Sequence, residues 1–432
     1  MTGSQTLVPK KLLVVQVAAL GWDLVKDLPA FHSAEAFFPA VTCTAQAGFR
    51  TASLPRSHGM VANGVRLPDL RKILFWEQSS ALVQGDRIWS RFRASGRKAG
   101  MIFWQQSLGD SALDLVFSPA PIHKHSGGMI QDCYAKPDGL AQWLTQQVGR
   151  PFNLMHYWGP VASQKSSVWI TDATSAILRS DRFAPDLLFS YLPHLDYDLQ
   201  RHGPGSRQAR DSLAFTLQCI ERLKTEAQSR GYDFLFYGDY AIQPTHEVNA
   251  AIFPNRRLAE TAQLATREIK RMLYADLFSS PAFAMVDHQI AHVYTRDAAA
   301  TTAAREALST LPGIDSILDR EHQSLLGLDH PRSGDLLLIA QPGHWFAYPW
   351  WTDNKKAPDF APHVDIHNKP GYDPCELFFG WPPPSVSMDT TRIRGSHGRP
   401  GDSVAWTTSL DFPVPPATML DIARFTKAWL DS

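Results

Sequence analysis

The chain has 432 residues, of which 44% are hydrophobic and 11% aromatic. This composition excludes an intrinsically disordered protein and is sufficient to form a sizeable buried core. Lysine and arginine together number 42, as do aspartate and glutamate, so the formal net charge is zero. We therefore expect neither nucleic acid nor an anionic membrane surface as a partner.

The first hydrophobic segment, residues 12–20, follows Lys10 and Lys11 and has the outline of a short signal peptide. It is short, however, contains several valines, and ends in Gly21-Trp22-Asp23, which is typical of a turn from a strand into a helix. We therefore predict a buried first strand. The four cysteines are far apart and form no CxxC pair, which favours a reduced, cytoplasmic protein and argues against a thiolate zinc site.

Short apolar segments bounded by turn residues recur along the chain and alternate with longer helical patterns. The predicted strands are residues 12–17, 98–103, 187–192, 234–237 and 282–286. Residues 208–230 and 261–275 have the spacing of helices. This alternation predicts an α/β fold with a mostly parallel central sheet and helices on both faces.

Two segments of this chain, which we expect to fold as a single domain over residues 1–432, have a distinct composition. Residues 66–159 are rich in tryptophan, and we predict that they form an aromatic-rich cap whose side chains line a pocket. The alternative for any single tryptophan is ordinary core packing. Residues 282–340 have a strand-helix-strand pattern, which predicts a small α+β insertion.

A threonine lies where an apolar segment passes into a predicted helix, in the sequence Phe38-Pro39-Ala40-Val41-Thr42. At a helix N-terminus, free backbone N–H groups and the helix dipole favour an incoming anion. Thr42 is therefore a candidate nucleophile for phosphoryl transfer. Asn63, in the turn after His58, is the candidate donor to the developing oxyanion. The alternative is that Thr42 is an ordinary N-cap.

These two segments together resemble the type I phosphodiesterase/nucleotide pyrophosphatase branch of the alkaline phosphatase superfamily. In that branch a Pro-x-x-Thr pattern supplies the nucleophile, and a His-Gly-x-x-x-Asn turn follows it. The residues in register with both patterns are Pro39, Thr42, His58, Gly59 and Asn63. The resemblance covers most of the chain and implies an alkaline phosphatase-like fold.

Relatives in this superfamily hold two zinc-type ions, which neutralise the phosphate and acidify the alcohol of the nucleophile. Three of the six ligand positions that the resemblance implies are kept, as Asp196, Asp239 and His397. The other three positions carry Ala18, Gln200 and Tyr240. We therefore expect a divalent metal cofactor, zinc, at an altered site that holds at most one ion in the manner of the relatives.

Nearby residues could replace the lost ligands. Asp198 and His202 repeat the Asp-x-x-x-His spacing two residues further on, so a shifted register would place His202 where Gln200 lies. The pair Gly203-Pro204 favours the unshifted register. His194 is a second possible substitute.

Two further groups are candidates for substrate binding. His363, Asp365 and His367 would share one side of an extended strand, where they could meet a metal or a phosphate, or they belong to a surface loop. Arg394 and Arg399 flank the last metal-ligand position and could clamp phosphate oxygens.

Two classes of function are consistent with these features. The first is a hydrolase of phosphate esters, similar to a phosphodiesterase or nucleotide pyrophosphatase, that acts on a small phosphate ester or nucleotide-like substrate through Thr42. The alternative is a phosphate- or nucleotide-binding protein without turnover, or a lyase or transferase on the same fold. Retention of Thr42 and Asn63 favours an enzyme, whereas the loss of three ligands favours a binding protein.

Overall fold

The computed structural model describes residues 10–124 and 129–432. An eight-stranded sheet lies at its centre, with the strand order β2-β22-β11-β1-β10-β5-β6-β9. These strands are β1 (Leu12–Val17), β2 (His32–Glu35), β5 (Ala99–Ile102), β6 (Leu115–Pro119), β9 (Cys133–Lys136), β10 (Leu187–Leu192), β11 (Asp233–Gly238) and β22 (Ser403–Thr408). The five strands from β11 to β6 are parallel, and β2, β22 and β9 pair antiparallel at the two edges. The predicted mostly parallel sheet is therefore confirmed.

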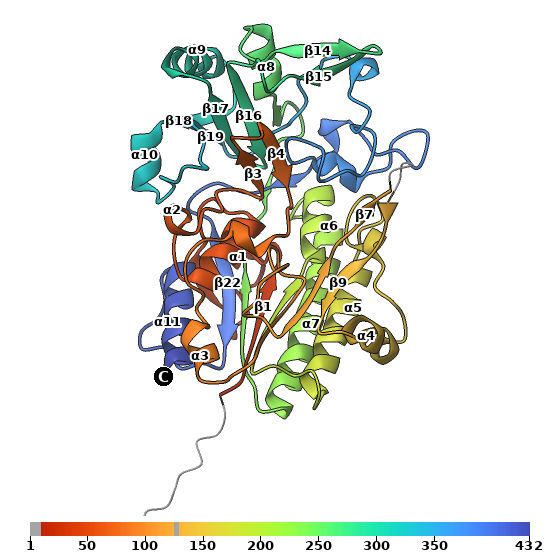
Figure 1. Cartoon of the computed structure of the whole chain (residues 1–432), viewed down its shortest axis with the longest axis vertical. Helices are drawn as coiled ribbons and strands as arrows, with labels where there is room; N and C mark the ends of the chain where they lie inside the picture. Colours follow the sequence, from red (N-terminus) through yellow and green to blue (C-terminus); the bar gives the residue numbers. More distant parts are fainter. Residues whose placement is uncertain (1–9, 125–128) are drawn as a thin grey trace, which may run out of the picture.

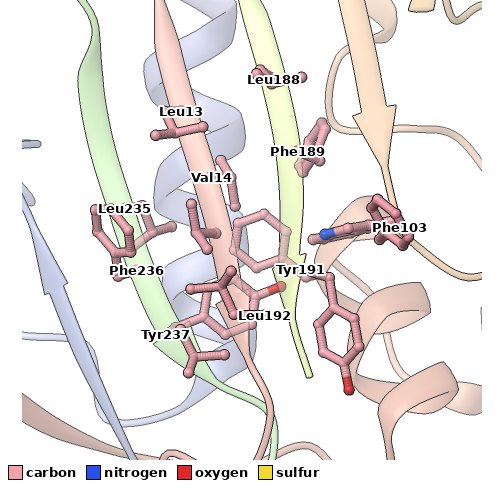
Figure 2. Close-up of a cluster of buried hydrophobic side chains, with 14 of the residues drawn as sticks. Leu13, Val14, Phe103, Leu188, Phe189, Tyr191, Leu192, Leu235, Phe236 and Tyr237 are labelled. Carbon is pink, nitrogen blue, oxygen red and sulfur yellow. The ribbon is translucent and has the colours of Figure 1, made fainter. Parts of the chain in front are cut away.

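Strand β1 lies between β10 and β11, and all six of its residues are buried. Figure 2 shows its Leu13 and Val14 packed among apolar side chains of both neighbouring strands. A parallel strand covered on both faces needs a nearly continuous apolar sequence, which explains why this segment also has the outline of a signal peptide. The prediction of a buried strand is confirmed.

Helices cover both faces of the central sheet (Figure 1). One group consists of α1 (Thr42–Thr51), α3 (Ser90–Ala94) and α11 (Met419–Asp431), in which α11 contacts both of the others. The second group consists of α4 (Leu140–Val148), α5 (Lys165–Arg179), α6 (His194–His202) and α7 (Arg207–Ser229). None of the helices in the described ranges has the length and apolar character needed to cross a membrane.

A second, antiparallel sheet lies at one end of the molecule (Figure 1), with the order β16-β17-β19-β18. Its strands are β16 (Ala282–Asp287), β17 (Ile290–Thr295), β18 (Ile314–Leu318) and β19 (Leu336–Ala340). It carries α9 (Ala298–Ser309) and α10 (Arg320–Leu325), and α8 (Pro254–Glu260) contacts β16 and α9. The four strands, α9 and α10 lie within residues 282–340, where we expected a small α+β insertion, whereas α8 precedes that region.

The segment 66–159, which we expected to be a cap, contributes instead to the central sheet. Residues 99–102 and 115–119 are buried apolar runs and form β5 and β6, while 133–136 form the edge strand β9. The rest of this segment includes β4 (Lys72–Phe75), which pairs with β3 (Gly64–Leu67), and the short hairpin of β7 (Ile122–His123) and β8 (Met129–Ile130). Tryptophan content alone did not distinguish sheet from cap.

The predicted helix over 261–275 is wrong. This segment forms a hairpin of β14 (Thr266–Ile269) and β15 (Met272–Ala275). Lys270 and Arg271 at its turn have φ values of 50° and 68°. Two consecutive left-handed residues match the twist of a two-residue hairpin turn, so the turn decides the structure over the helical spacing.

Two short ladders bring late segments of the chain back to the central sheet and the insertion. β12 (Gln243–Pro244) pairs with β21 (Gly395–Ser396), and β13 (Ala251–Ile252) pairs with β20 (Trp345–Phe346). The first ladder places the residues after β21 beside the end of β11. A short helix, α2 (Pro55–His58), precedes the turn that carries Asn63.

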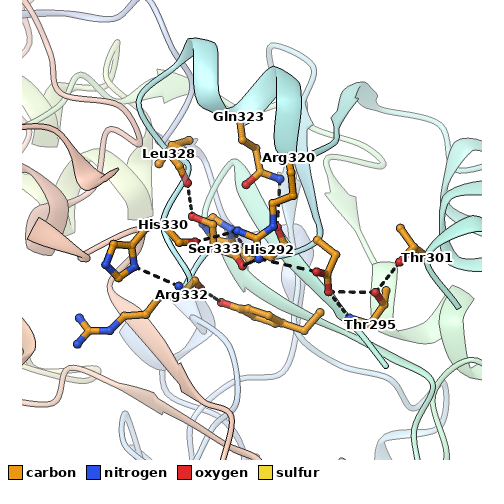
Figure 3. Close-up of polar contacts among 12 residues, drawn as sticks. His292, Thr295, Thr301, Arg320, Gln323, Leu328, His330, Arg332 and Ser333 are labelled. Atoms are coloured by element: carbon orange, nitrogen blue, oxygen red, sulfur yellow. Dashed lines mark hydrogen bonds and ion pairs between the residues drawn. The ribbon is translucent and has the colours of Figure 1, made fainter. Parts of the chain in front are cut away.

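Polar contacts connect His292 and its neighbours within the insertion (Figure 3). His292 also fastens the insertion to the turn that carries Asn63. His292 on β17 is fully buried; its Nε2–H donates to the carbonyl of Val61 at 3.0 Å, and its Nδ1 accepts from the Gly334 N–H at 3.1 Å. Gln323 donates to the carbonyls of Leu318 and Gly334. Because both imidazole nitrogens are used in the neutral form, protonation of His292 would break one of these bonds.

We predict that His292 contributes to acid sensitivity. Burial lowers its pKa from 6.5 to about 4, so between these values the unfolded chain binds a proton that the folded chain does not. The free energy of unfolding should therefore fall as the pH is lowered from 6.5 towards 4, with His292 contributing about 1.4 kcal/mol per pH unit. The free energy of unfolding, measured with urea at each pH, should change less with pH in His292→Gln than in the unaltered protein. The exposed His202→Gln should show the same dependence on pH as the unaltered protein, and an equal dependence in both variants would refute the prediction.

Candidate active site

The carboxyl ends of three neighbouring parallel strands converge on the candidate site. Ala18 follows β1, Asp196 lies in the first turn of α6 just after β10, and Asp239 follows β11. In open α/β sheets, ligands bind outside this edge of the sheet. The strand positions therefore bring together three residues that are up to 221 positions apart in the sequence (239 minus 18).

Thr42 is the first residue of α1 and lines a cavity of about 100 Å³ at this edge. Its hydroxyl does not cap the helix, because the oxygen of the Asn63 side chain accepts from the Cys43 N–H at 2.9 Å. The phenols of Tyr191 and Tyr240 lie close to Thr42 and line the same cavity. The structure thus places the Thr42 oxygen at a helix N-terminus and beside a cavity.

The ring of Tyr240 lies in the middle of the site. It stacks on the His397 ring with centroids 3.5 Å apart and planes within 3° of parallel. Its hydroxyl donates to Oδ1 of Asp196 at 3.0 Å. Burial raises the pKa of Tyr240 well above its usual value, so the phenol remains a neutral donor.

Both oxygens of Asp196 accept hydrogen bonds from the chain. Its second oxygen accepts from Nε2 of Gln200 at 2.7 Å, and Oε1 of Gln200 accepts from the Tyr372 hydroxyl at 2.9 Å. Burial raises the pKa of Asp196 to about 6, although the bonds from Tyr240 and Gln200 oppose this shift. Tyr240 and Gln200 stand at two of the replaced metal-ligand positions. Both therefore form hydrogen bonds with Asp196, which is a retained metal-ligand position.

Asp239 is likewise saturated with donors from the chain itself. It accepts from Nε2 of Gln16 at 2.8 Å and from the N–H groups of Ala19 and Tyr240 at 3.0 and 3.1 Å. Burial raises its pKa to about 8. This carboxyl group stabilises the ends of β1 and β11, and it does not line the cavity.

His397 reaches the site through the ladder of β12 and β21. Its Nδ1–H donates to the carbonyl of Ala40 at 2.7 Å, and its Nε2 has no partner among the described residues. The ring of His288 lies 3.8 Å from that of His397 and 3.6 Å from that of Tyr372. A column of four rings thus runs along one wall of the site.

Asn63 is held beside α1 by a carboxylate that sequence reasoning did not assign. Its backbone N–H and its Nδ2 donate to the two oxygens of Asp287 at 2.7 and 3.1 Å. Asp287 also binds Nδ1 of His288 at 2.7 Å. The Nδ2 group of Asn63 has a second hydrogen, and its predicted role as an oxyanion donor stays a prediction.

The other walls of the cavity are aromatic. They are formed by Phe75, Trp76, Tyr157, Trp158, Tyr191, Tyr197 and Tyr372. The first four of these belong to the segment 66–159, in which we expected pocket-lining aromatic residues. Some of this segment therefore lines the cavity, although most of its strands build the sheet.

One cation lines the cavity in the described parts of the chain, and sequence reasoning did not identify it. Lys369 is 1% exposed, and its Nζ lies 2.8 Å from Oδ2 of Asp373 and 2.6 Å from Oε1 of Glu376. Burial lowers the pKa of Lys369, but the two carboxylates raise it more, so the ammonium remains charged. The dense polar segment around His367 was the feature of the sequence that could have pointed to Lys369.

The shifted register that would have made His202 a metal ligand is not adopted. Asp196 and Gln200 line the cavity, whereas His202 is exposed in the last turn of α6. Asp198 accepts from the Ser212 hydroxyl at 2.5 Å instead. His194, the other substitute ligand, is buried and contacts the Ser167 hydroxyl at 2.8 Å.

The structure places the four predicted substrate-binding residues outside the cavity. Arg394 donates to backbone carbonyls of its own loop, and Arg399 pairs with Asp315 at 3.5 Å. His363 and His367 lie in turns, so the expected extended strand is wrong, and both line a neighbouring groove. The position of Arg394 and Arg399 beside His397 in the sequence therefore did not predict which cationic side chain lines the cavity.

Comparison with known proteins agrees with this fold. A family model described as type I phosphodiesterase / nucleotide pyrophosphatase matches residues 24–373. Phosphonoacetate hydrolase from Sinorhizobium meliloti 1021, solved with phosphonoformate, has a TM-score of 0.65 and 16% identity, and the match covers 98% of this chain and 96% of that one. Murine ectonucleotide pyrophosphatase / phosphodiesterase 5 has a TM-score of 0.61 and 13% identity, with 98% and 95% covered. No curated protein sequence matches the chain.

The residues present do not fit the two-zinc site that the resemblance implies. In residues 10–124 and 129–432, no group of three or more His, Cys, Asp or Glu side chains is arranged to hold a metal ion. Asp196 and Asp239 already accept hydrogen bonds from the chain, and Ala18 offers no ligand atom. Of the three retained ligands, which all lie in the described residues, His397 alone has a side-chain atom without a hydrogen-bond partner, and one imidazole does not make a zinc site.

We predict that the protein binds well below one equivalent of zinc after dialysis against zinc-free buffer. The triple variant Ala18→Asp/Gln200→His/Tyr240→His, which restores all three ligands, should retain at least one equivalent, measured by inductively coupled plasma mass spectrometry. Circular dichroism checks that the variant is folded. Stoichiometric zinc in the unaltered protein would show that the hydrogen bonds of Asp196 and Asp239 do not close the site.

Proposed function

Since the chain belongs to the type I phosphodiesterase/nucleotide pyrophosphatase family, we propose that it hydrolyses phosphate esters through a covalent intermediate on Thr42. The observation that carries this proposal is the position of the Thr42 hydroxyl, at the first turn of α1 and on the wall of the cavity. Neither packing nor helix capping requires a hydroxyl there, because Asn63 supplies the cap.

In the proposed reaction, Oγ1 of Thr42 attacks the phosphorus atom, and the ester oxygen leaves as an alkoxide or phenoxide that takes a proton from solvent water. The bond from Thr42 to phosphorus forms as the bond to the leaving oxygen breaks, and water then hydrolyses the phosphothreonine. The phenol of Tyr240 lies close to Thr42 and donates a hydrogen bond to Asp196. This chain of groups provides a path for the proton that Thr42 must lose.

Two features of the described residues oppose the negative charge of the phosphate. The N-terminus of α1 presents backbone N–H groups and the positive end of the helix dipole. Lys369 has three N–H donors, of which two bind Asp373 and Glu376, so the third can bind a ligand oxygen. These groups supply part of the positive charge that metal ions supply in relatives.

A second candidate function is the binding of a phosphate ester without turnover. It is supported by the hydrogen bonds that occupy Asp196 and Asp239, since these leave the retained ligands without a metal. The structural relatives were solved with small phosphorus-containing ligands, phosphonoformate and AMP. We propose the same class of ligand, a small phosphate ester or nucleotide-like molecule, for this chain.

Replacement of Thr42 tests the proposed function directly. We expect Thr42→Ala to lower kcat/KM for bis-p-nitrophenyl phosphate at least about 1000-fold, because it removes the nucleophile. Thr42→Ser should keep part of the activity, and Thr51→Ala, at the other end of α1, should keep all of it. Unchanged turnover in Thr42→Ala would refute the nucleophile, and a lack of turnover in the unaltered protein with retained phosphate-ester binding would favour the second candidate.

Replacement of Lys369 tests the source of positive charge. We expect Lys369→Met to weaken phosphate binding by isothermal titration calorimetry about tenfold, because a charge-assisted bond in a buried site is lost. Since the change also leaves two buried carboxylates unpaired, we expect the double variant Lys369→Met/Glu376→Gln to be the better folded of the two. The exposed Lys356→Met is the control, and phosphate affinity equal to that of the control in both variants would exclude a role for Lys369 in binding.

A further inference from the structure

A groove of about 990 Å³ lies beside the cavity, and its lining is largely apolar. Its walls come from the flanks of the β7–β8 hairpin, from residues 154–161 and from the loops between 359 and 384, which lie on the same side of the molecule in Figure 1. The apolar residues that line it include Leu154, Met155, Val161, Phe360, Val364 and Phe379. No function that we have assigned so far uses this groove.

The groove adjoins the cavity that contains Thr42. Trp158 and Ile366 line both of them. A molecule whose phosphate lies at Thr42 could therefore extend past these two side chains into the groove. The groove is also much larger than a water-filled gap between side chains would be.

The charge of the groove restricts what it can hold. No lysine or arginine lines it in the described parts of the chain, and its charged residues are the carboxylates of Asp359 and Asp365. Asp359 accepts from the Tyr274 hydroxyl, and Asp365 accepts from Asn368. The two carboxylates would repel the negative charges of an acidic peptide or of a fatty-acid carboxylate. An uncharged apolar chain has no polar groups to desolvate, so it could enter the groove without that cost.

Exposed apolar side chains gather around the rim of this groove. Met155 is 51% exposed, and Trp381, near the lining residues Phe379 and Pro384, is 89% exposed. Ile122 and Ile130, each next to a lining residue on the β7–β8 hairpin, are exposed as well. Exposed apolar side chains beside an apolar groove are a common feature of binding sites.

We propose that the substrate is a phosphate ester that carries a long, uncharged hydrocarbon chain, which lies in this groove while the phosphate lies at Thr42. The position of the phosphate rests on the proposed function, and the place of the chain rests on the two side chains, Trp158 and Ile366, that line both the groove and the cavity. The chain would gain affinity by burial of its methylene groups against the apolar lining.

Calorimetric binding of alkylphosphonates, which Thr42 cannot hydrolyse, tests this proposal. Octylphosphonate should bind at least about 100-fold more tightly than methylphosphonate, since each fully buried methylene contributes a factor of roughly four. Met155→Glu and Val161→Glu should reduce this gain at least about tenfold. Leu325→Glu, an equally drastic change of an exposed apolar residue on α10, should leave it intact.

Equal affinity for the two phosphonates would overturn the proposal, as would a gain that Met155→Glu and Val161→Glu reduce no more than Leu325→Glu does. Binding of 1-octanol as tight as that of octylphosphonate would also overturn it, because the groove would then serve an apolar partner without a phosphate. If p-nitrophenyl octyl phosphate is not turned over but octylphosphonate binding still depends on the groove residues, the proposed hydrolysis fails and the ligand class stands.

Discussion

The hydrogen bond from Tyr240 to Asp196, together with the stacking of the Tyr240 ring on His397, determines what this site can hold. In the relatives that the sequence resembles, this position carries an imidazole that binds a metal ion. Here a phenol, which is neutral and cannot readily lose its proton when buried, stands in its place and binds a retained ligand instead. The two aspartates that remain are then paired with donors of the protein, and their pKa values are raised because burial disfavours their charge.

The same arrangement changes how charge is balanced around a phosphate. In a two-metal site, the ions supply the positive charge, and the protein supplies carboxylates and imidazoles to hold them. In this site the positive charge comes from the N-terminus of α1 and from Lys369, which is itself paired with Asp373 and Glu376. Such a site holds a phosphate less strongly, so affinity must come in part from elsewhere. The aromatic walls of the cavity and the apolar groove beyond Trp158 could supply this additional affinity.

Much of this architecture follows from the sequence, for reasons that particular residues make clear. The strands at 12–17 and 187–192 were predictable because buried parallel strands need unbroken apolar sequence. Asp196 and Asp239 were assigned through the family resemblance, and both follow such strands; Thr42 was assigned from its place at a predicted helix start. Lys369, Asp287 and His288 were not, since they reach the site from loops and from the insertion, through contacts that no local pattern specifies. The error over 261–275 had a different cause, because its helical spacing was overridden by a two-residue turn.

The most direct test of this account is the position of Tyr240 when zinc is available. Crystals grown with excess zinc chloride, and measured at the zinc absorption edge, would show both the ring and any bound ion. We predict that the Tyr240 ring remains stacked on His397 and that no anomalous peak lies between Asp196 and Asp239. Two anomalous peaks at that place, with the Tyr240 side chain turned away from Asp196, would contradict the account.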